Sequence, residues 1–474
     1  MRVLFTSAPE PGSVVESAEA WLPLALVHLA GAVRAAGHEC EIVDALSLGL
    51  GIDDVERIVR ETRPDAVCIS ASTPGIPASL ELARRIRATG RTTVLGGIHA
   101  SFMYPEFLPG GAVDFAVVGE GEETLPELLR CLNVGADPVR VAGIAFALGG
   151  RVVRTAPRPR MTALDPIPKA WDLLPSSRYR WAGRPWAQMG ATATSRGCPR
   201  RCGSCCHSTQ YEGTWRMRSV DSVAYELTQL RREHGVDLVS FYDPAPAADA
   251  QRFAALTERL IELDLGLEIV IWGSVHDILR DEALLPQWRA AGVIHVGICR
   301  DPAEDRLDGS AMGGAVSNGR RAVQALRRAG IGSETSFWLG FPDETPATIE
   351  EALSRALAWG PDTANFPLLT PLPYTPAWRT YGSHVITRDY SRYNQRNPVV
   401  KPDHMELHEV EEAAESCRRR FLAERPPRVV SSEIRRAGPW MVHPVEPVVP
   451  APAPAAPVGE EAKQDAPPPP VPRQ

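Results

Sequence analysis

The chain has 474 residues, of which 44% are hydrophobic and 23% charged, and its formal net charge is −7. This length accommodates two globular domains with ordinary cores. The acidic balance argues against a nucleic-acid partner, because binding to a phosphate backbone relies on clustered Lys and Arg. No uninterrupted apolar stretch approaches the roughly 20 residues of a membrane span, and the first residues are typical of a buried strand, not of a signal peptide. We therefore expect a cytoplasmic protein with no membrane span.

The first third of the chain alternates short apolar strands with helices. The pattern predicts helices at 22–36, 78–88 and 124–132 and strands at 3–5, 40–43, 66–70, 93–96 and 115–118. Such alternation predicts an α/β domain with a parallel, Rossmann-like sheet, which we assign to residues 1–135. Ligands of these sheets lie at the carboxyl ends of the strands.

The rest of the chain divides into four parts. We expect a connector at 136–190, with a hairpin at 144–153, and a helical C-terminal extension at 386–424. Between them, at 191–385, alternation resumes and fits a full or partial parallel TIM barrel, with its active site at the carboxyl ends of the strands. The strands predicted there are 239–242, 268–272, 295–298, 336–339 and 365–370. The Pro- and Ala-rich tail at 425–474 cannot bury a core and is expected to be disordered.

The nine cysteines are an odd number in a chain without a secretory signal, which favours metal or redox use over disulfides. Three of them, Cys198, Cys202 and Cys205, are spaced C-x3-C-x2-C. Zinc is the competing interpretation, but structural zinc takes four ligands in two paired clusters, and no second Cys or His pair has such spacing. We expect Cys206 and His207 near the metal but not bound to it. Three thiolates on one loop can hold three irons of a 4Fe–4S cluster and leave the fourth open.

This motif, followed by a barrel-like repeat, resembles the radical S-adenosylmethionine (SAM) superfamily. The resemblance implies that the open iron chelates the amino and carboxylate groups of SAM and that the sulfonium is cleaved reductively. The resulting deoxyadenosyl radical would remove hydrogen from a small-molecule substrate, while the protein orients the reactants and excludes water and oxygen. A low-potential electron donor such as flavodoxin or ferredoxin is the implied partner.

A doubly wound domain in front of such a barrel resembles the cobalamin-binding domain of the cobalamin-dependent branch of that superfamily. The matching segments are 95–100 (LGGIHA) and 118–123 (VGEGEE), whose glycines allow the corrin ring to approach the backbone. No D-x-H-x-x-G occurs, so a protein histidine beneath cobalt is not expected, and the absence of G-x-G-x-x-G argues against a nucleotide site. His99 either faces the corrin or is a hydrogen-bonding spacer. The implied cobalamin contacts are Ser72, Thr73, Gly96, Gly97, His99, Gly119, Glu120 and Gly121.

Longer stretches within residues 1–425 resemble one family in particular, the anaerobic magnesium-protoporphyrin IX monomethyl ester oxidative cyclases of bacteriochlorophyll synthesis. The resemblance implies oxidation of a propionate methyl ester side chain and closure of the fifth ring, with oxygen from water. The stretches are 93–105, 277–281, 291–296, 361–365, 370–373, 389–393 and 398–403.

The sequence departs from that family where SAM contacts are expected. Ser204 replaces an aromatic residue, Cys299 stands where a glutamate is expected, and 272–277 (WGSVHD) is two residues short and lacks an arginine. Cys299 cannot accept a charged hydrogen bond from an ammonium group as glutamate would. Either Arg300, His276 or Asp243 rebuilds the SAM site together with Ser204, or the chain is a diverged paralogue.

Three functions follow from these features. The first is the oxidative cyclase acting on a tetrapyrrole, and the second is a cobalamin-dependent radical C-methyltransferase. The third is a non-catalytic protein that binds a tetrapyrrole or cobalamin. The sequence identifies no catalytic residue beyond the cofactor ligands.

Overall fold

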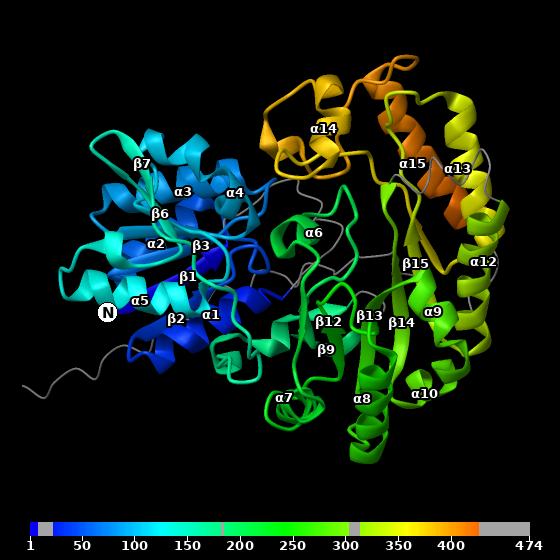
Figure 1. Ribbon diagram of the computed structural model, residues 1–474, viewed down its shortest axis with the longest axis horizontal. Helices are drawn as coiled ribbons and strands as arrows, with labels where there is room; N and C mark the ends of the chain where they lie inside the picture. The colour runs from blue at the N-terminus through cyan, green and yellow to red at the C-terminus, as the bar shows by residue number, and fades with distance from the viewer. Residues whose placement is uncertain (8–21, 182–183, 303–312, 426–474) are drawn as a thin grey trace, which may run out of the picture. The chain divides into compact units, whose positions relative to one another are not determined.

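The computed structural model describes residues 1–7, 22–181, 184–302 and 313–425. Almost all of the predicted tail, residues 426–474, therefore lies outside the described residues. Two seven-stranded sheets dominate the described part of the chain, and a two-stranded ribbon accompanies them (Figure 1).

The first sheet has the strand order β2-β1-β3-β4-β5-β6-β7. The first five strands are parallel, as the alternation predicted, and β6 and β7 add an antiparallel hairpin to the free edge of β5. The hairpin predicted at 144–153 is therefore present, and it extends this sheet beyond residue 135. The strands are β1 (Arg2–Ser7), β2 (Glu39–Val43), β3 (Ala66–Ser70), β4 (Thr92–Gly96), β5 (Phe115–Val117), β6 (Ile144–Leu148) and β7 (Arg151–Arg154).

Helices cover both faces of this sheet because alternate strand residues point to opposite sides. Val3 and Phe5 of β1 pack in the core that contains α1 and α5, whereas Leu4 packs in the core that contains α2, α3 and α4. The helices are α1 (Leu24–Ala35), α2 (Ile52–Thr62), α3 (Ile76–Ala88), α4 (Ile98–Phe107) and α5 (Gly121–Asn133). The apolar pattern of the sequence did not predict α2 or α4.

The turn from β4 into α4 depends on a glycine. Gly97 has φ +103°, a backbone conformation that disfavours side chains, and a Cβ built there would lie 2.4 Å from the carbonyl oxygen of Ala71. Residues 96–100 are therefore the end of a strand, one tight turn and the start of a helix. The backbone at Ala71 by itself requires glycine at position 97, so this glycine is not evidence for a bound ligand.

The second sheet is an open, partial barrel with the strand order β16-β15-β14-β13-β12-β9-β8. Six strands are parallel and β8 is an antiparallel edge. The predicted fold class is confirmed: a Rossmann-like domain, a partial barrel and a helical C-terminal part. The strands are β8 (Arg180–Trp181), β9 (Arg184–Thr192), β12 (Leu238–Phe241), β13 (Glu268–Ser274), β14 (Val293–Cys299), β15 (Gly332–Ser336) and β16 (Thr363–Asn365). The helices between them are α7 (Val220–Arg232), α8 (Ala250–Leu263), α9 (Val275–Arg280), α10 (Leu285–Ala290), α12 (Gly313–Arg328) and α13 (Pro346–Trp359).

Two strands were predicted too late in the chain. The strands expected at 336–339 and 365–370 are β15 and β16, which begin four and two residues earlier. β15 was predicted too late because Ser333, Glu334 and Thr335 are polar yet buried. Glu334 accepts a hydrogen bond from Asn365 and lies 3.5 Å from Nε2 of His295, so neighbouring strands satisfy its carboxylate.

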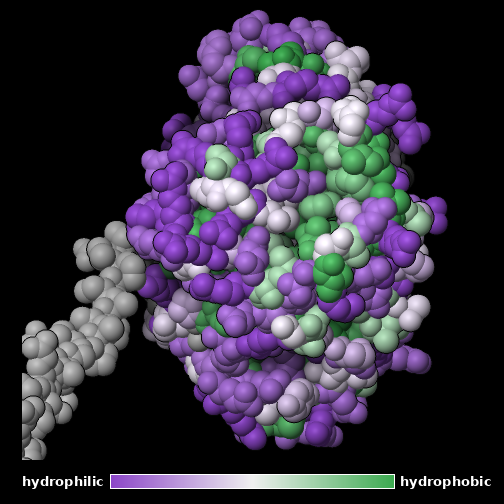
Figure 2. Space-filling model, turned by 90° about the vertical axis from the view of Figure 1, so that its left-hand side faces the viewer, coloured by the Kyte–Doolittle hydropathy of each residue, from purple (hydrophilic) through white to green (hydrophobic). Residues whose placement is uncertain are grey.

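The C-terminal part contains α14 (Ala377–Tyr381) and α15 (Leu407–Glu424). α15 packs against α13 at the outer side of the barrel (Figure 1). None of the helices in the described residues is long and apolar enough to cross a membrane. In Figure 2, hydrophilic side chains cover most of one face of the molecule, and hydrophobic ones gather in a band on its right-hand half.

Candidate functional site

The three motif cysteines lie on a loop at the carboxyl end of β9. The chain passes from β9 into β10 (Ser195–Gly197), forms the cysteine loop, and continues into α6 (Cys206–Tyr211) and β11 (Trp215–Met217). β10 and β11, which precede and follow the cysteine loop and α6, pair antiparallel and so fix both ends of this segment. Cys198 is buried, Cys202 and Cys205 are partly buried, and all three are free thiols.

Three other elements hold the cysteine loop in place. The backbone N–H of Gly203 donates to Asp301 beyond β14 at 2.7 Å, and its carbonyl accepts from the N–H of Ala377 at 2.9 Å. Arg200 forms an ion pair with the buried Asp277 of α9. The loop conformation is therefore set by protein contacts, which is the preorganisation that a cluster site needs.

The thiols suit iron coordination. A hydrogen bond from the Cys206 thiol and the nearby His207 lower the pKa of Cys205, although burial opposes them. Cys206 is therefore a neighbour that favours the thiolate form of Cys205, one of the three predicted iron ligands. Three thiols on one compact loop, without a disulfide, fit three corners of a 4Fe–4S cluster.

The predicted SAM contacts are dispersed. His276 is exposed, with 77% of its side chain accessible, and the guanidinium of Arg300 lies over the ring of Trp359 at 4.6 Å. Ser204 donates to Asp301 at 3.3 Å. Cys299 stands at the end of β14, opposite Ser274 of β13 in the strand register.

Cys299 lies beside the cysteine loop. Its side chain is accessible to solvent. Many protein atoms nevertheless lie around the thiol, and the partial loss of water raises its pKa to about 12. The nearby Cys205, Cys198 and Cys202 raise the pKa further, whereas Arg200 lowers it.

A cavity of about 470 Å³ separates the cysteine loop from the carboxyl edge of the first sheet. Leu24, His28 and Leu29 of α1 line one side, together with the glycine-rich turns after β4 and β5. The other side consists of β10, α6 and the segment after β12. Its lining includes Gly96, Gly97, Gly119, Glu120, Gly121, Arg196, Gly197, His207, Tyr211, Tyr242 and Asp243.

This cavity fits a flat macrocycle. Leucine, valine and tyrosine side chains form much of its wall, and Gly96 and Gly119 have no atom within 4 Å of a Cβ placed on them, so the backbone is open to a ligand. Five of the eight predicted cobalamin contacts line it, namely Gly96, Gly97, Gly119, Glu120 and Gly121.

The other three predicted contacts, Ser72, Thr73 and His99, are not among the lining residues. Nδ1 of the buried His99 lies 3.3 Å from Oγ1 of Thr73, which in turn lies 2.8 Å from the hydroxyl of Tyr374. The His99 ring also packs edge-on against Tyr390 at 4.8 Å. Of its two interpretations, this geometry favours the hydrogen-bonding spacer, which ties α4 to the C-terminal extension.

Burial lowers the pKa of His99 to about 4. Between pH 6.5 and 4 the unfolded chain therefore binds a proton at this position that the folded chain does not, so stability falls as the pH falls. Because of His99, we expect the free energy of unfolding to be about 2 kcal/mol lower at pH 5 than at pH 7.5. Urea unfolding of wild type and His99→Gln at both pH values measures this. If the unfolding free energies of both proteins change equally with pH, His99 is not the group responsible.

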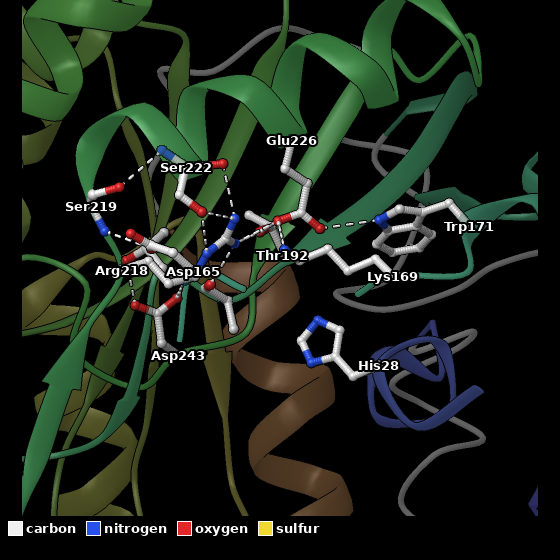
Figure 3. Close-up of polar contacts among 12 residues, drawn as sticks. His28, Asp165, Lys169, Trp171, Thr192, Arg218, Ser219, Ser222, Glu226 and Asp243 are labelled. Atoms are coloured by element: carbon white, nitrogen blue, oxygen red, sulfur yellow. Dashed lines mark hydrogen bonds and ion pairs between the residues drawn. The ribbon is translucent and has the colours of Figure 1, made fainter. Parts of the chain in front are cut away.

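A buried polar cluster lies beneath the strand that leads into the cysteine loop (Figure 3). The carboxylate of Glu226 on α7 pairs with Arg218 and accepts hydrogen bonds from Thr192 at 2.8 Å and Trp171 at 3.1 Å. Nζ of Lys169 lies 3.9 Å away. Burial raises the pKa of Glu226, but Arg218 and Lys169 outweigh it and bring the pKa below its usual value. The cluster therefore holds an ionised pair inside the protein.

Asp243, predicted to contact SAM, also supports this strand. Its carboxylate accepts from the N–H of Thr194 at 3.0 Å, the Thr194 hydroxyl at 2.8 Å and the Ser195 hydroxyl at 2.7 Å. Arg252 donates to the carbonyl of Thr194 at 2.7 Å. Four residues before Cys198, Asp243 and Arg252 thus hold the backbone of Thr194 from both its N–H and its carbonyl.

Glu226 and Arg218 were not among the residues predicted from the sequence, although the sequence holds a signal for Glu226. Glu226 lies among the buried positions Val223, Leu227 and Leu230 on the inner face of α7. A carboxylate on the apolar face of a helix requires a buried partner, and Arg218, in the extended segment just before the helix, is that partner.

Two family matches agree with this arrangement. Residues 12–129 match the B12 binding domain, and residues 192–356 match the radical SAM superfamily. The chain is thus a cobalamin-binding radical SAM enzyme, whose cofactors are a 4Fe–4S cluster, SAM and cobalamin.

Full-length relatives narrow the assignment. The anaerobic magnesium-protoporphyrin IX monomethyl ester cyclase of Rubrivivax gelatinosus is 35% identical over 436 residues, which cover 89% of this chain and 77% of that protein. The chain belongs to the family of cobalamin-binding radical SAM enzymes that contains these cyclases. The hopanoid C-3 methylase of Methylococcus capsulatus is 26% identical over 80% of this chain and 72% of that protein. The radical SAM methyltransferase TsrM from Kitasatospora setae has the same fold, with a TM-score of 0.66 and 20% identity over 89% of this chain and 83% of that chain.

Proposed function

We propose that this enzyme is an oxidative cyclase that acts on magnesium-protoporphyrin IX monomethyl ester or a closely related tetrapyrrole ester. The observation that carries the proposal is the collinear similarity to the Rubrivivax gelatinosus cyclase through both domains and the C-terminal extension. The substrate side chain would be oxidised and closed into the fifth ring, with its oxygen taken from water. SAM would be the oxidant over successive turnovers, since each SAM cleaved to methionine and deoxyadenosine would take up electrons and hydrogen that the side chain loses.

In this proposal, Cys198, Cys202 and Cys205 hold the cluster, and the glycine-rich turns after β4 and β5 hold the corrin. The cluster and SAM, when bound, supply a deoxyadenosyl radical that removes hydrogen from the substrate. The chain itself has two tasks. Leu24, Leu29 and Tyr242 line the cavity and exclude water, and the contacts of Gly203 keep the cysteine loop from moving.

The direct test uses anaerobic enzyme reconstituted with iron, sulfide and cobalamin, then supplied with SAM, a low-potential flavodoxin or chemical reductant, and the porphyrin ester. We expect deoxyadenosine together with a ring-closed product, and ¹⁸O in that product when the water is labelled. Deoxyadenosine formed while the porphyrin ester stays unchanged would exclude this substrate.

A radical C-methyltransferase is the second candidate, because methyltransferases are among the full-length relatives. It predicts S-adenosylhomocysteine together with deoxyadenosine and a product heavier by one methyl group. The same reaction mixtures decide between the two candidates, since the cyclase forms no S-adenosylhomocysteine.

The departure at Cys299 gives a gain-of-function prediction. Cys299→Glu restores a carboxylate beside the cysteine loop, where it can accept a charged hydrogen bond from the SAM ammonium group. Such a bond contributes about 1.5–3 kcal/mol, so we expect SAM to bind at least about tenfold more tightly. Anaerobic equilibrium binding measures the affinity, and Cys299→Gln, similar in size but uncharged, is the matched control. Equal SAM affinity in the two variants would show that a carboxylate at this position does not contact SAM.

A further inference from the structure

Four charged side chains join the first sheet to the cysteine loop, and we call them the docking cluster: Glu120, Glu122, Arg196 and Arg216. Glu120 is the residue just before α5, and Glu122 is in the first turn of that helix, at the carboxyl edge of the first sheet. Arg196 is in β10, two residues before Cys198, and Arg216 is in β11.

The two arginines are directly opposite each other in the β10–β11 register. Like charges at such positions repel and destabilise a strand pair. Here both point toward Glu120, whose Oε1 lies 2.5 Å from Arg216 and 3.4 Å from Arg196. Arg196 also pairs with Glu122. Two carboxylates from the first sheet thus neutralise two guanidinium groups from the ribbon that carries the cysteine loop.

These contacts are largely shielded from water. The side chains of Glu120 and Glu122 are 9% and 8% exposed, and those of Arg196 and Arg216 are 13% and 15% exposed. Arg216 and Arg196 lower the pKa of Glu120 despite its burial, so the carboxylate is ionised. A buried pair of this kind is costly to break, because removing one partner leaves an unpaired buried charge.

A neutral histidine completes the cluster. Nδ1 of His28 lies 3.2 Å from Nη2 of Arg196, and arginine can only donate, so Nδ1 accepts. Burial, together with Arg196, lowers the pKa of His28 to about 3. The histidine therefore adds no charge, and the two carboxylates balance the two guanidinium groups.

The cluster lies on the wall of the cavity and next to the first cysteine. Glu120, Glu122 and Arg196 all line the 470 Å³ cavity, and only Gly197 separates Arg196 from Cys198. A displacement of Arg196 therefore moves the Cys198 thiol relative to the glycine-rich turns on the opposite wall. The carboxylate of Glu120 also accepts from the N–H of Met161, which fixes the connector in the same position.

We propose that the docking cluster sets the distance and orientation between the iron–sulfur cluster and the cobalamin, with Arg196 as the positioning residue. The sequence placed Glu120 among the cobalamin contacts, but its carboxylate is used by the two arginines. This inference rests on the proposed cofactor sites.

The test is the magnetic interaction between cob(II)alamin and the reduced cluster, measured by EPR on anaerobic holoenzyme, with iron and cobalamin contents determined on the same samples. We expect Arg196→Gln and Glu122→Gln to keep the iron and cobalamin of wild type but to show a changed interaction. Glu120→Gln, which keeps the shape of the side chain, should do the same if Arg196→Gln does not fold. Arg196→Lys should not restore the wild-type interaction, because one ammonium cannot reproduce the planar fork that meets both carboxylates.

Arg34→Gln is the matched control. Arg34 pairs with Asp172 at 2.6 Å and also joins α1 to the connector, but the pair is 42% and 56% exposed. We expect this variant to behave as wild type. An unchanged interaction in the docking-cluster variants, or an equal change in Arg34→Gln, would overturn the inference. Failure of the proposed cofactor sites is a different result, because wild type itself would then lack iron or cobalamin.

Discussion

Replacing Cys198, Cys202 or Cys205 singly by alanine is expected to remove most of the bound iron and all deoxyadenosine formation. Each thiolate would hold one iron of a cluster with three protein ligands, so the loss of one leaves two irons without a protein anchor. Anaerobic purification with iron and sulfide quantified per chain, followed by SAM cleavage assays, measures both effects. Cobalamin binding should persist, because the corrin would be held by a different wall of the cavity.

Two other cysteines serve as controls for that experiment. Cys417→Ala changes a buried thiol on α15, far along the chain from the motif, and should keep wild-type iron. Cys206→Ala changes the thiol next to Cys205 in the chain, which we do not expect to bind iron, and should also keep wild-type iron. Iron retained in full by all three motif variants would overturn the cluster assignment.

Removal of the buried carboxylate in Glu226→Ala is expected to reduce the free energy of unfolding by about 3–5 kcal/mol. The variant leaves Arg218 buried without its counter-charge and takes the acceptor away from Thr192 and Trp171. Chemical unfolding followed by tryptophan fluorescence measures the change. Because Thr192 ends the strand that leads to the cysteine loop, iron retention should fall as well.

The matched control is a surface ion pair. Glu350 pairs with Arg420 at 2.6 Å, but the two side chains are 55% and 42% exposed. Glu350→Ala should cost less than about 1 kcal/mol, because water screens such pairs. The double variant Arg218→Met, Glu226→Leu removes both buried charges and should recover part of the stability lost in Glu226→Ala. Similar losses in Glu226→Ala and Glu350→Ala would show that the buried pair contributes little.

Much of the fold could be predicted because apolar periodicity reports burial directly. β1, β3 and β4 are apolar runs between helices, and the sequence located each of them within two residues. The strands it misplaced are those whose inward side chains are polar. Glu334 in β15 is buried only because Asn365 and His295 from neighbouring strands surround it, and no local pattern contains that information.

The candidate site divides in the same way. Cofactor ligands have characteristic spacings in the chain, so the sequence by itself determined the three-cysteine motif, the glycine-rich turns and hence the class of enzyme. Which charges meet was decided only by the tertiary structure. It directed Glu120 toward two arginines, placed His99 against Tyr390, and set Cys299 beside the cysteine loop. The physical reason is that a ligand loop is local in sequence, whereas a buried charge is stabilised by partners that folding brings from distant segments.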